Sequence, residues 1–174
     1  SVMEAELSTL RRLGGSEKNM LAVQSNLAMT YCKLGRHEEA LDLQREVYSV
    51  CSKVFGEHEH TLLAANNYAS NLVTLKRFGE ARSLMQKTMP VARRVLGDSH
   101  DYTLTMRKVY AESFCLDASA TLDDLREAVT TFEDTARIAR RVFGGAHPIT
   151  VRNERSLRNA RTVLRARETP SGSS

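Results

Sequence analysis

Histidine is the residue type in this sequence that could most readily hold a metal ion. His58 and His60 form a His-x-His pair, and His100 and His147 occupy related places further along the chain. Zinc–nitrogen bonds are near 2 Å, whereas neighbouring loops in a stack of helix pairs lie roughly 10 Å apart. Histidines of separate loops are therefore not expected to share an ion, and we predict no metal site.

Cysteine nucleophiles and paired carboxylates are the other candidates for chemistry. Cys32, Cys51 and Cys115 lack the neighbouring histidine and acid that would activate a nucleophile, and we expect them to be small apolar residues of the interior. Adjacent acids such as Asp123-Asp124 are typical of helix starts. There is neither a glycine-rich phosphate loop of the P-loop type nor a Gly-x-Ser-x-Gly motif. The sequence thus predicts no enzyme and no cofactor.

Composition indicates a helical globular protein. The 174 residues are 41% apolar and 26% charged, with only 3 Pro and 9 Gly, which disfavours a β-sandwich or barrel. No apolar run approaches the ~18 residues that span a bilayer, so we expect no membrane partner. Three scattered cysteines favour a reducing, cytoplasmic location. The net charge of +4 permits an acidic partner but lacks the dense basic footprint of a nucleic-acid binder.

Internal repeats determine the architecture. Related Val-x-Gly segments that lead to a threonine occur at residues 54–62, 95–104 and 142–151. A second pattern recurs as Asn26-Leu27-Ala28, Asn67-Tyr68-Ala69 and Val109-Tyr110-Ala111. A third pattern centres on Ala40, Ala81 and Ala128, at steps of 41 and 47 residues. Repetition at such intervals is typical of solenoid proteins.

Each repeat has the pattern of two helices separated by a tight turn. In the first full unit, one helix is expected over about residues 17–34 and a second over about 37–55, with Gly35 and Gly56 as helix stops. Leu27, Tyr31 and Leu34 follow the i, i+4, i+7 spacing of one helix face. Because neither helix can bury its apolar stripe alone, neighbouring units must stack. The predicted fold is all-α, an α-solenoid of antiparallel helix pairs.

These patterns resemble tetratricopeptide repeats of the kinesin light chain type, whose units are longer than the roughly 34 residues of the common repeat. The matching residues are Asn26-Leu27-Ala28, Tyr31, Gly35-Arg36, Glu38-Glu39-Ala40, Gly56-Glu57-His58 and Thr61-Leu62. The resemblance covers nearly the whole chain. It implies a superhelix in which the first helix of each pair lines a concave groove, and loop histidines that cap or pack.

The repeats divide the chain into six segments. Residues 1–15 are expected to end a preceding repeat, 16–56, 57–97 and 98–144 to form three repeats, 145–167 to form a half repeat or capping helix, and 168–174 to form a disordered tail.

Three departures from the pattern are informative. Lys76 stands where the first unit has Gly35, so its turn is expected to be strained. Pro90 lies inside a predicted helix and should kink it. Extra residues around 116–124 require a longer loop, where Thr121 or Asp123 could cap the following helix.

The resemblance also implies a peptide site. In such arrays an asparagine one residue before the Leu-Ala pair hydrogen-bonds the main chain of an extended peptide, which here assigns Asn26 and Asn67. The third unit has Val109 at that place. The alternative is that both amides bond within their helix pair. Helical spacing extends the strip to Met29, Lys33, Asn66, Ser70, Lys108, Glu112, Arg152, Arg155 and Asn159.

Basic residues outnumber acidic ones along this strip, which favours an acidic peptide; the alternative is a set of ordinary solvated side chains. We therefore predict a protein-interaction scaffold that binds an extended acidic segment. The alternatives are self-association as a homo-oligomer and packing against another domain of a larger protein. Nucleic-acid binding through the arginine-rich last helix is the less favoured alternative.

Overall fold

The computed structural model describes residues 2, 4–5, 8 and 17–169. The segments expected to end a preceding repeat (1–15) and to form a tail (168–174) lie largely outside the described residues, although Glu168 still belongs to the last helix. Between Glu17 and Glu168 the chain is helical, as predicted. The helices are α2 (Glu17–Lys33), α3 (His37–Val54), α4 (Glu59–Thr74), α5 (Phe78–Val95), α6 (Asp101–Cys115), α7 (Leu122–Phe143) and α8 (Pro148–Glu168).

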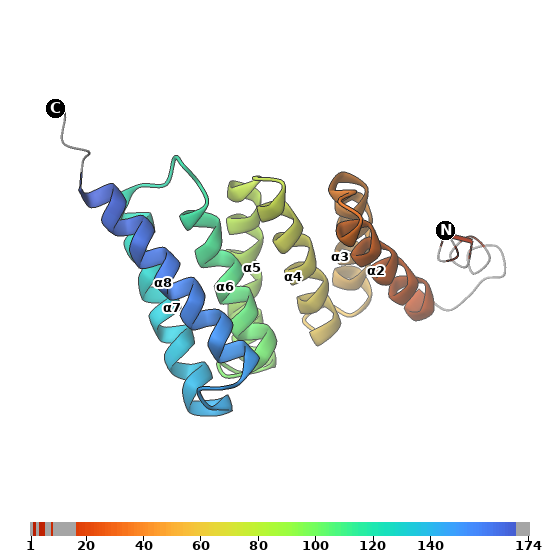
Figure 1. Cartoon of the computed structure of the whole chain (residues 1–174). Coiled ribbons are helices and arrows are strands. Elements are labelled where there is room, and N and C mark those ends of the chain that lie inside the picture. Colours follow the sequence, from red (N-terminus) through yellow and green to blue (C-terminus); the bar gives the residue numbers. More distant parts are fainter. Residues whose placement is uncertain (1, 3, 6–7, 9–16, 170–174) are drawn as a thin grey trace.

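The helices form two layers (Figure 1). Helices α2, α4, α6 and α8 lie on the near side in Figure 1, and we call them the A layer; α3, α5 and α7 lie behind them and form the B layer. Each helix packs against the next one along the chain, and α6 also contacts both α4 and α8. This arrangement confirms the predicted α-solenoid. By length and hydropathy, the described helices include none that could traverse a lipid bilayer.

The turns within the first two helix pairs confirm the expected backbone strain. Gly35 has φ +76°, a left-handed conformation that glycine adopts freely. Lys76 occupies the equivalent place with φ +60°, which costs a residue with a Cβ about 1–2 kcal/mol. Pro90, which was expected to kink α5, is exposed, and the helix is continuous through it from Phe78 to Val95.

The loop histidines cap helices, as the resemblance implies. The Nδ1 atoms of His58, His100 and His147 each accept a hydrogen bond from the main-chain N–H two residues later, at 3.2, 3.3 and 3.3 Å. The His147 ring also stacks on Phe143, with centroids 4.8 Å apart. Within the described ranges, no three His, Cys, Asp or Glu residues gather where they could hold a metal ion.

The apolar core is continuous in the later repeats and divided in the first. One cluster extends through helices α4 to α8 and includes Met85, Met106, Phe114 and Phe132. The first pair contributes smaller clusters. One of these, Leu21, Val47, Cys51 and Ala64, joins α2 and α3 to α4, and another, Leu41, Leu72 and Ala81, joins α3 to α4 and α5. The first repeat is therefore joined to the rest of the array by separate clusters and not by the continuous core.

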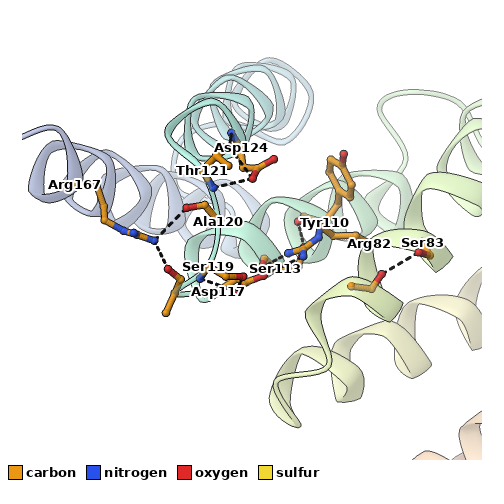
Figure 2. Close-up of polar contacts among 12 residues, drawn as sticks. Arg82, Ser83, Tyr110, Ser113, Asp117, Ser119, Ala120, Thr121, Asp124 and Arg167 are labelled. Carbon is orange, nitrogen blue, oxygen red and sulfur yellow. Dashed lines mark hydrogen bonds and ion pairs between the residues drawn. The ribbon is translucent and has the colours of Figure 1, made fainter.

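The extra residues of the third repeat form a loop with a defined helix start. Thr121 is the N-cap of α7, and its hydroxyl accepts from the Asp124 N–H at 3.1 Å. In return, the Thr121 N–H donates to the Asp124 carboxylate at 2.8 Å, which completes a capping box (Figure 2). Asp123, the other expected cap, instead pairs with Arg126 at 2.9 Å.

Helix α5 of the preceding repeat holds one side of this loop. The Arg82 guanidinium pairs with the Asp117 carboxylate at 3.0 Å and donates to the Ser113 carbonyl at 3.0 Å. Its Cζ also lies 4.8 Å from the centre of the Phe114 ring. Both members of the ion pair are largely shielded, with side chains 22% and 13% exposed. Arg82 therefore ties the second repeat to the end of α6.

Helix α8 of the following repeat holds the other side. Arg167 donates to the carbonyls of Ala118 and Ala120 at 2.6 and 3.2 Å (Figure 2). Inside the loop, Ser119 donates from both its N–H and its hydroxyl to Asp117, at 2.9 and 2.6 Å. These bonds to Ser119, together with Arg82, lower the pKa of the Asp117 carboxyl. The inserted loop is thus fixed from both neighbouring repeats.

Candidate functional site

Two clefts open on the A layer, and residues of the predicted strip line each of them. The first cleft, about 340 Å³, lies between α2 and α4 and reaches down to α3. Asn26 and Asn67 both line it, Asn26 exposed and Asn67 half-buried. Its walls are largely apolar and include Leu21, Val47 and Phe55. The structure thus brings together the two asparagines that the repeat pattern singled out.

Both asparagine amides are available to a ligand. Among residues 17–169, the side chains of Asn26 and Asn67 form no hydrogen bond; Thr30 bonds only the main-chain carbonyl of Asn26, at 2.9 Å. Asn71 provides the contrast on the same helix as Asn67. Its amide donates to the His37 carbonyl at 2.8 Å, and its oxygen lies 3.0 Å from His37 Nδ1. Pairing within the helix bundle therefore occupies Asn71 and leaves the other two amides unoccupied.

The second cleft, about 540 Å³, lies between α4 and α6. Ser70, Lys108 and Glu112 line it, as the strip requires. Lys108 Nζ lies 2.6 Å from the Glu112 carboxylate, which also accepts from Ser156 of α8 at 3.3 Å. The charge of Lys108 is therefore balanced inside the protein.

The remaining predicted residues are dispersed. Arg152, Arg155 and Asn159 lie on the exposed surface of α8, and Lys33 is exposed at the end of α2. Met29, 47% exposed, lines neither cleft.

Asn66 is buried and also lines neither cleft. Its Oδ1 is enclosed without a hydrogen-bond partner. Consecutive residues of a helix point about 100° apart, and here the Asn66 side chain lies on the side of α4 that packing covers.

Sequence reasoning missed the apolar side of the second cleft. Val73 and Phe78 line it together with Leu116, which is 61% exposed at the start of the inserted loop. A leucine just beyond the last helical residue was the available signal. Its meaning depends on the loop geometry that Arg82 and Arg167 impose, which the sequence pattern does not show.

The arginine doublets near the ends of the B-layer helices mostly pair with acids. Arg93 lies 2.7 Å from Asp98, and Arg94 lies 2.6 Å from Glu57. Arg140 makes the same kind of contact with Glu154 of α8, at 2.5 Å. Arg93 and Arg140 thus pair across repeat boundaries and Arg94 pairs within the second repeat, so these three arginines do not form a free stripe for phosphate.

Comparison with known proteins identifies the repeats. Residues 19–93 match the tetratricopeptide repeat family. The chain therefore carries tetratricopeptide repeats over residues 19–93, which hold nearly all of helices α2 to α5. No curated protein matches its sequence.

Solved structures share the fold of the chain. One is the crystal structure of a point variant of TPR-like repeats, nearly identical to one another, from a Podosopora anserina protein named for kinesin light chain. Its sequence is 20% identical to that of this chain, and the TM-score is 0.78 over 95% of this chain and 77% of that one. A second structure of those repeats is 19% identical, with TM-score 0.71 over 97% and 86%. BtubC (BKLC) from P. vanneervenii is 13% identical, with TM-score 0.50 over 92% and 70%. These likenesses show the fold of the chain, a solenoid of stacked helix pairs.

Proposed function

We propose that the A layer binds an extended, acidic segment of a partner protein. The observation that supports this proposal most directly is the pair of unoccupied amides in the first cleft, Asn26 and Asn67. A side-chain amide both donates and accepts hydrogen bonds. It can therefore bond the N–H and the C=O of an extended main chain without requiring a particular side chain.

The preference for acidic residues follows from the balance of charge. Lys33, Arg152 and Arg155 are exposed on the strip and have no acidic partner among the described residues. Glu112, the one acidic residue of the strip, already pairs with Lys108. A carboxylate-bearing segment would therefore form charge-assisted hydrogen bonds without displacing an internal acid.

The cytoplasm is the proposed location. Cys32, Cys51 and Cys115 are all free thiols, which supports a reducing compartment.

Peptide binding by asparagine variants tests the proposal. Fluorescence anisotropy with extended peptides rich in Asp and Glu should show about a fivefold weaker affinity for Asn67→Ala, because one hydrogen bond contributes about 1 kcal/mol. The double variant with Asn26→Ala should lose more. Gln86→Ala is the control for loss of an exposed amide outside the cleft, since Gln86 lies on the B layer and donates to the Tyr110 hydroxyl at 3.3 Å.

Equal affinities for the wild type and the double variant would exclude the first cleft as the site. If no peptide binds and the sedimentation coefficient rises with protein concentration, self-association replaces the proposal.

A further inference from the structure

Positive charge is distributed unevenly along the A layer. In the middle, Lys108 is neutralised by Glu112. At one end, α8 carries six arginines and only two glutamates. The arginines of α8 differ in what they contact, and this difference indicates where a carboxylate can bind.

Two of the α8 arginines are committed to the fold. Arg161 pairs with Glu133 of α7 at 2.7 Å, and Arg167 holds the inserted loop. Arg152, Arg155 and Arg158 are exposed and have no acidic partner in the described part of the chain. Their spacing of three residues places successive side chains roughly 5–6 Å apart on one helix surface. They form a short row of free guanidinium groups, which we call the α8 arginine row.

We infer that the partner segment is bipartite, with a carboxylate cluster that binds the α8 arginine row and a separate stretch whose main chain binds Asn26 and Asn67. This inference rests on the proposed function and adds the position of the acidic residues. The α8 arginine row gathers three cations on one helix surface, whereas Lys33 and Lys76 are single exposed cations and Lys108 is already paired with Glu112.

The separation of the two parts follows from helix packing. Helix α4 contacts α6, and α6 contacts α8, so α4 and α8 are two interhelical steps apart, about 16–20 Å at about 8–10 Å per step. An extended chain advances about 3.3 Å per residue. The carboxylate cluster should therefore lie about 5–6 residues from the residue that Asn67 holds.

The spacer between the two parts crosses the second cleft. The wall of that cleft combines the Lys108–Glu112 pair and the exposed Lys76 with the apolar side chains of Phe78 and Leu116. An acid placed there would meet Glu112 as well as Lys108, and Lys76 is a single cation. The spacer is therefore expected to tolerate neutral residues and to gain less from added acids than the residues opposite the α8 arginine row.

A polypeptide fits the arginine row better than a nucleic acid does. The row is short, and the neighbouring Arg140 is already paired with Glu154. Nucleic-acid binders display a denser basic surface. Carboxylates of a peptide also match guanidinium groups with paired hydrogen bonds.

The test uses the full chain and random-sequence peptide pools of about 9 residues that carry a fixed Asp triplet either at an end or in the centre, because a central triplet then leaves too few residues on either side to reach Asn67 at about 3.3 Å per residue. The end-placed pools should be retained more strongly. The double variant Arg152→Gln/Arg155→Gln should bind the end-placed pools about 5- to 20-fold more weakly, with a shallower salt dependence, and should bind triplet-free pools as the wild type does. Arg45→Gln is the control, because Arg45 is an exposed arginine of α3, in the B layer of the first repeat.

Three outcomes would overturn the inference. These are stronger retention of the centre-placed pool, a larger loss from Lys108→Gln than from the double variant, and tighter binding of nucleic acid than of any peptide pool. If pools with phosphoserine bind several-fold more tightly than the Asp-triplet pools, the ligand of the α8 arginine row is a phosphate and not a carboxylate. Failure of this inference alone is recognised when Asn67→Ala weakens peptide binding and the arginine double variant does not. If Asn67→Ala also has no effect, the proposed function fails with it.

Discussion

The two junctions between complete repeats are built differently. At the first, α3 packs on α4, but α2 and α4 part around the cleft that holds Asn26 and Asn67. Two separate apolar clusters and the polar contact between His37 and Asn71 connect the two repeats. At the second, α4 and α6 pack directly, and Arg82 contacts Asp117, the Ser113 carbonyl and Phe114.

Junctions between similar repeats can therefore either join the repeats into one body or leave a cleft between their A-layer helices. The second junction, with its inserted loop held by Arg82 and Arg167, keeps the later repeats as one body with a continuous core. The first junction gives up contact between A-layer helices and gains a cleft with two free amides. The candidate site thus lies where the array is least consolidated.

Truncation of core side chains should give the largest difference in the free energy of unfolding between the two junctions. Phe114→Ala, which removes a ring 6% exposed in the continuous core, should lower the free energy of unfolding by about 3–5 kcal/mol. Val47→Ala, at the first junction, should cost less, about 1–2 kcal/mol, because it deletes less apolar surface and borders an existing cleft. Urea denaturation measures both. Equal losses would contradict the difference between the junctions.

Removal of the polar contacts should have the next largest effect. Arg82→Ala leaves a shielded carboxylate and a carbonyl without their donor, and should cost about 1.5–3 kcal/mol. Asn71→Ala at the first junction should cost about 1–2 kcal/mol. Hydrogen exchange distinguishes them further. Arg82→Ala should raise exchange in residues 116–121, and protection unchanged there would show that Arg82 does not hold the loop.

The second junction should also be sensitive to acid. The pKa of Asp117 is lowered in the folded protein by its bonds from Ser119 and Arg82. A carboxyl whose folded pKa is below its unfolded value stabilises the protein above the unfolded pKa, about 3.9, and loses that contribution as pH falls through the folded pKa. Asp117→Asn should therefore be less stable than the wild type at pH 7, and the gap should close below about pH 4. A gap that is independent of pH would contradict this assignment.

Substitutions in the turns of the first two helix pairs should change the stability least, and opposite substitutions at the two equivalent positions should have opposite effects. Lys76→Gly should raise stability by about 0.5–1 kcal/mol, because it relieves the left-handed strain at φ +60° and loses some of the gain to chain entropy. Gly35→Lys, at the equivalent place, should lower stability by a similar amount. Thermal melting of both variants checks the prediction, and shifts of the same sign would contradict it.

Local features of this fold were predictable from the sequence. Helix ends at Gly35 and Lys76, and the cap at Thr121, follow from backbone geometry within a few residues. The pairing of Lys108 with Glu112 was also within reach, because residues four apart on a helix are neighbours.

Long-range features were not predictable in the same way. The contact of Ser156 with Glu112 joins residues 44 apart in the chain, and the parting of α2 from α4 depends on how whole helices pack. Spacing placed Asn66 beside Asn67 on the strip, whereas packing buried the former and left the latter lining a cleft. Periodicity thus identifies a helix face but not which of two adjacent residues a neighbouring helix will cover.

The most direct test of the central claim is an NMR titration of the side-chain amide signals of asparagine with an acidic extended peptide. If the peptide binds in the first cleft, the NH2 resonances of Asn26 and Asn67 should move, while that of Asn71, which is bonded to His37, should stay in place. If the peptide binds and the signals of Asn26 and Asn67 do not move, the first cleft is not the site.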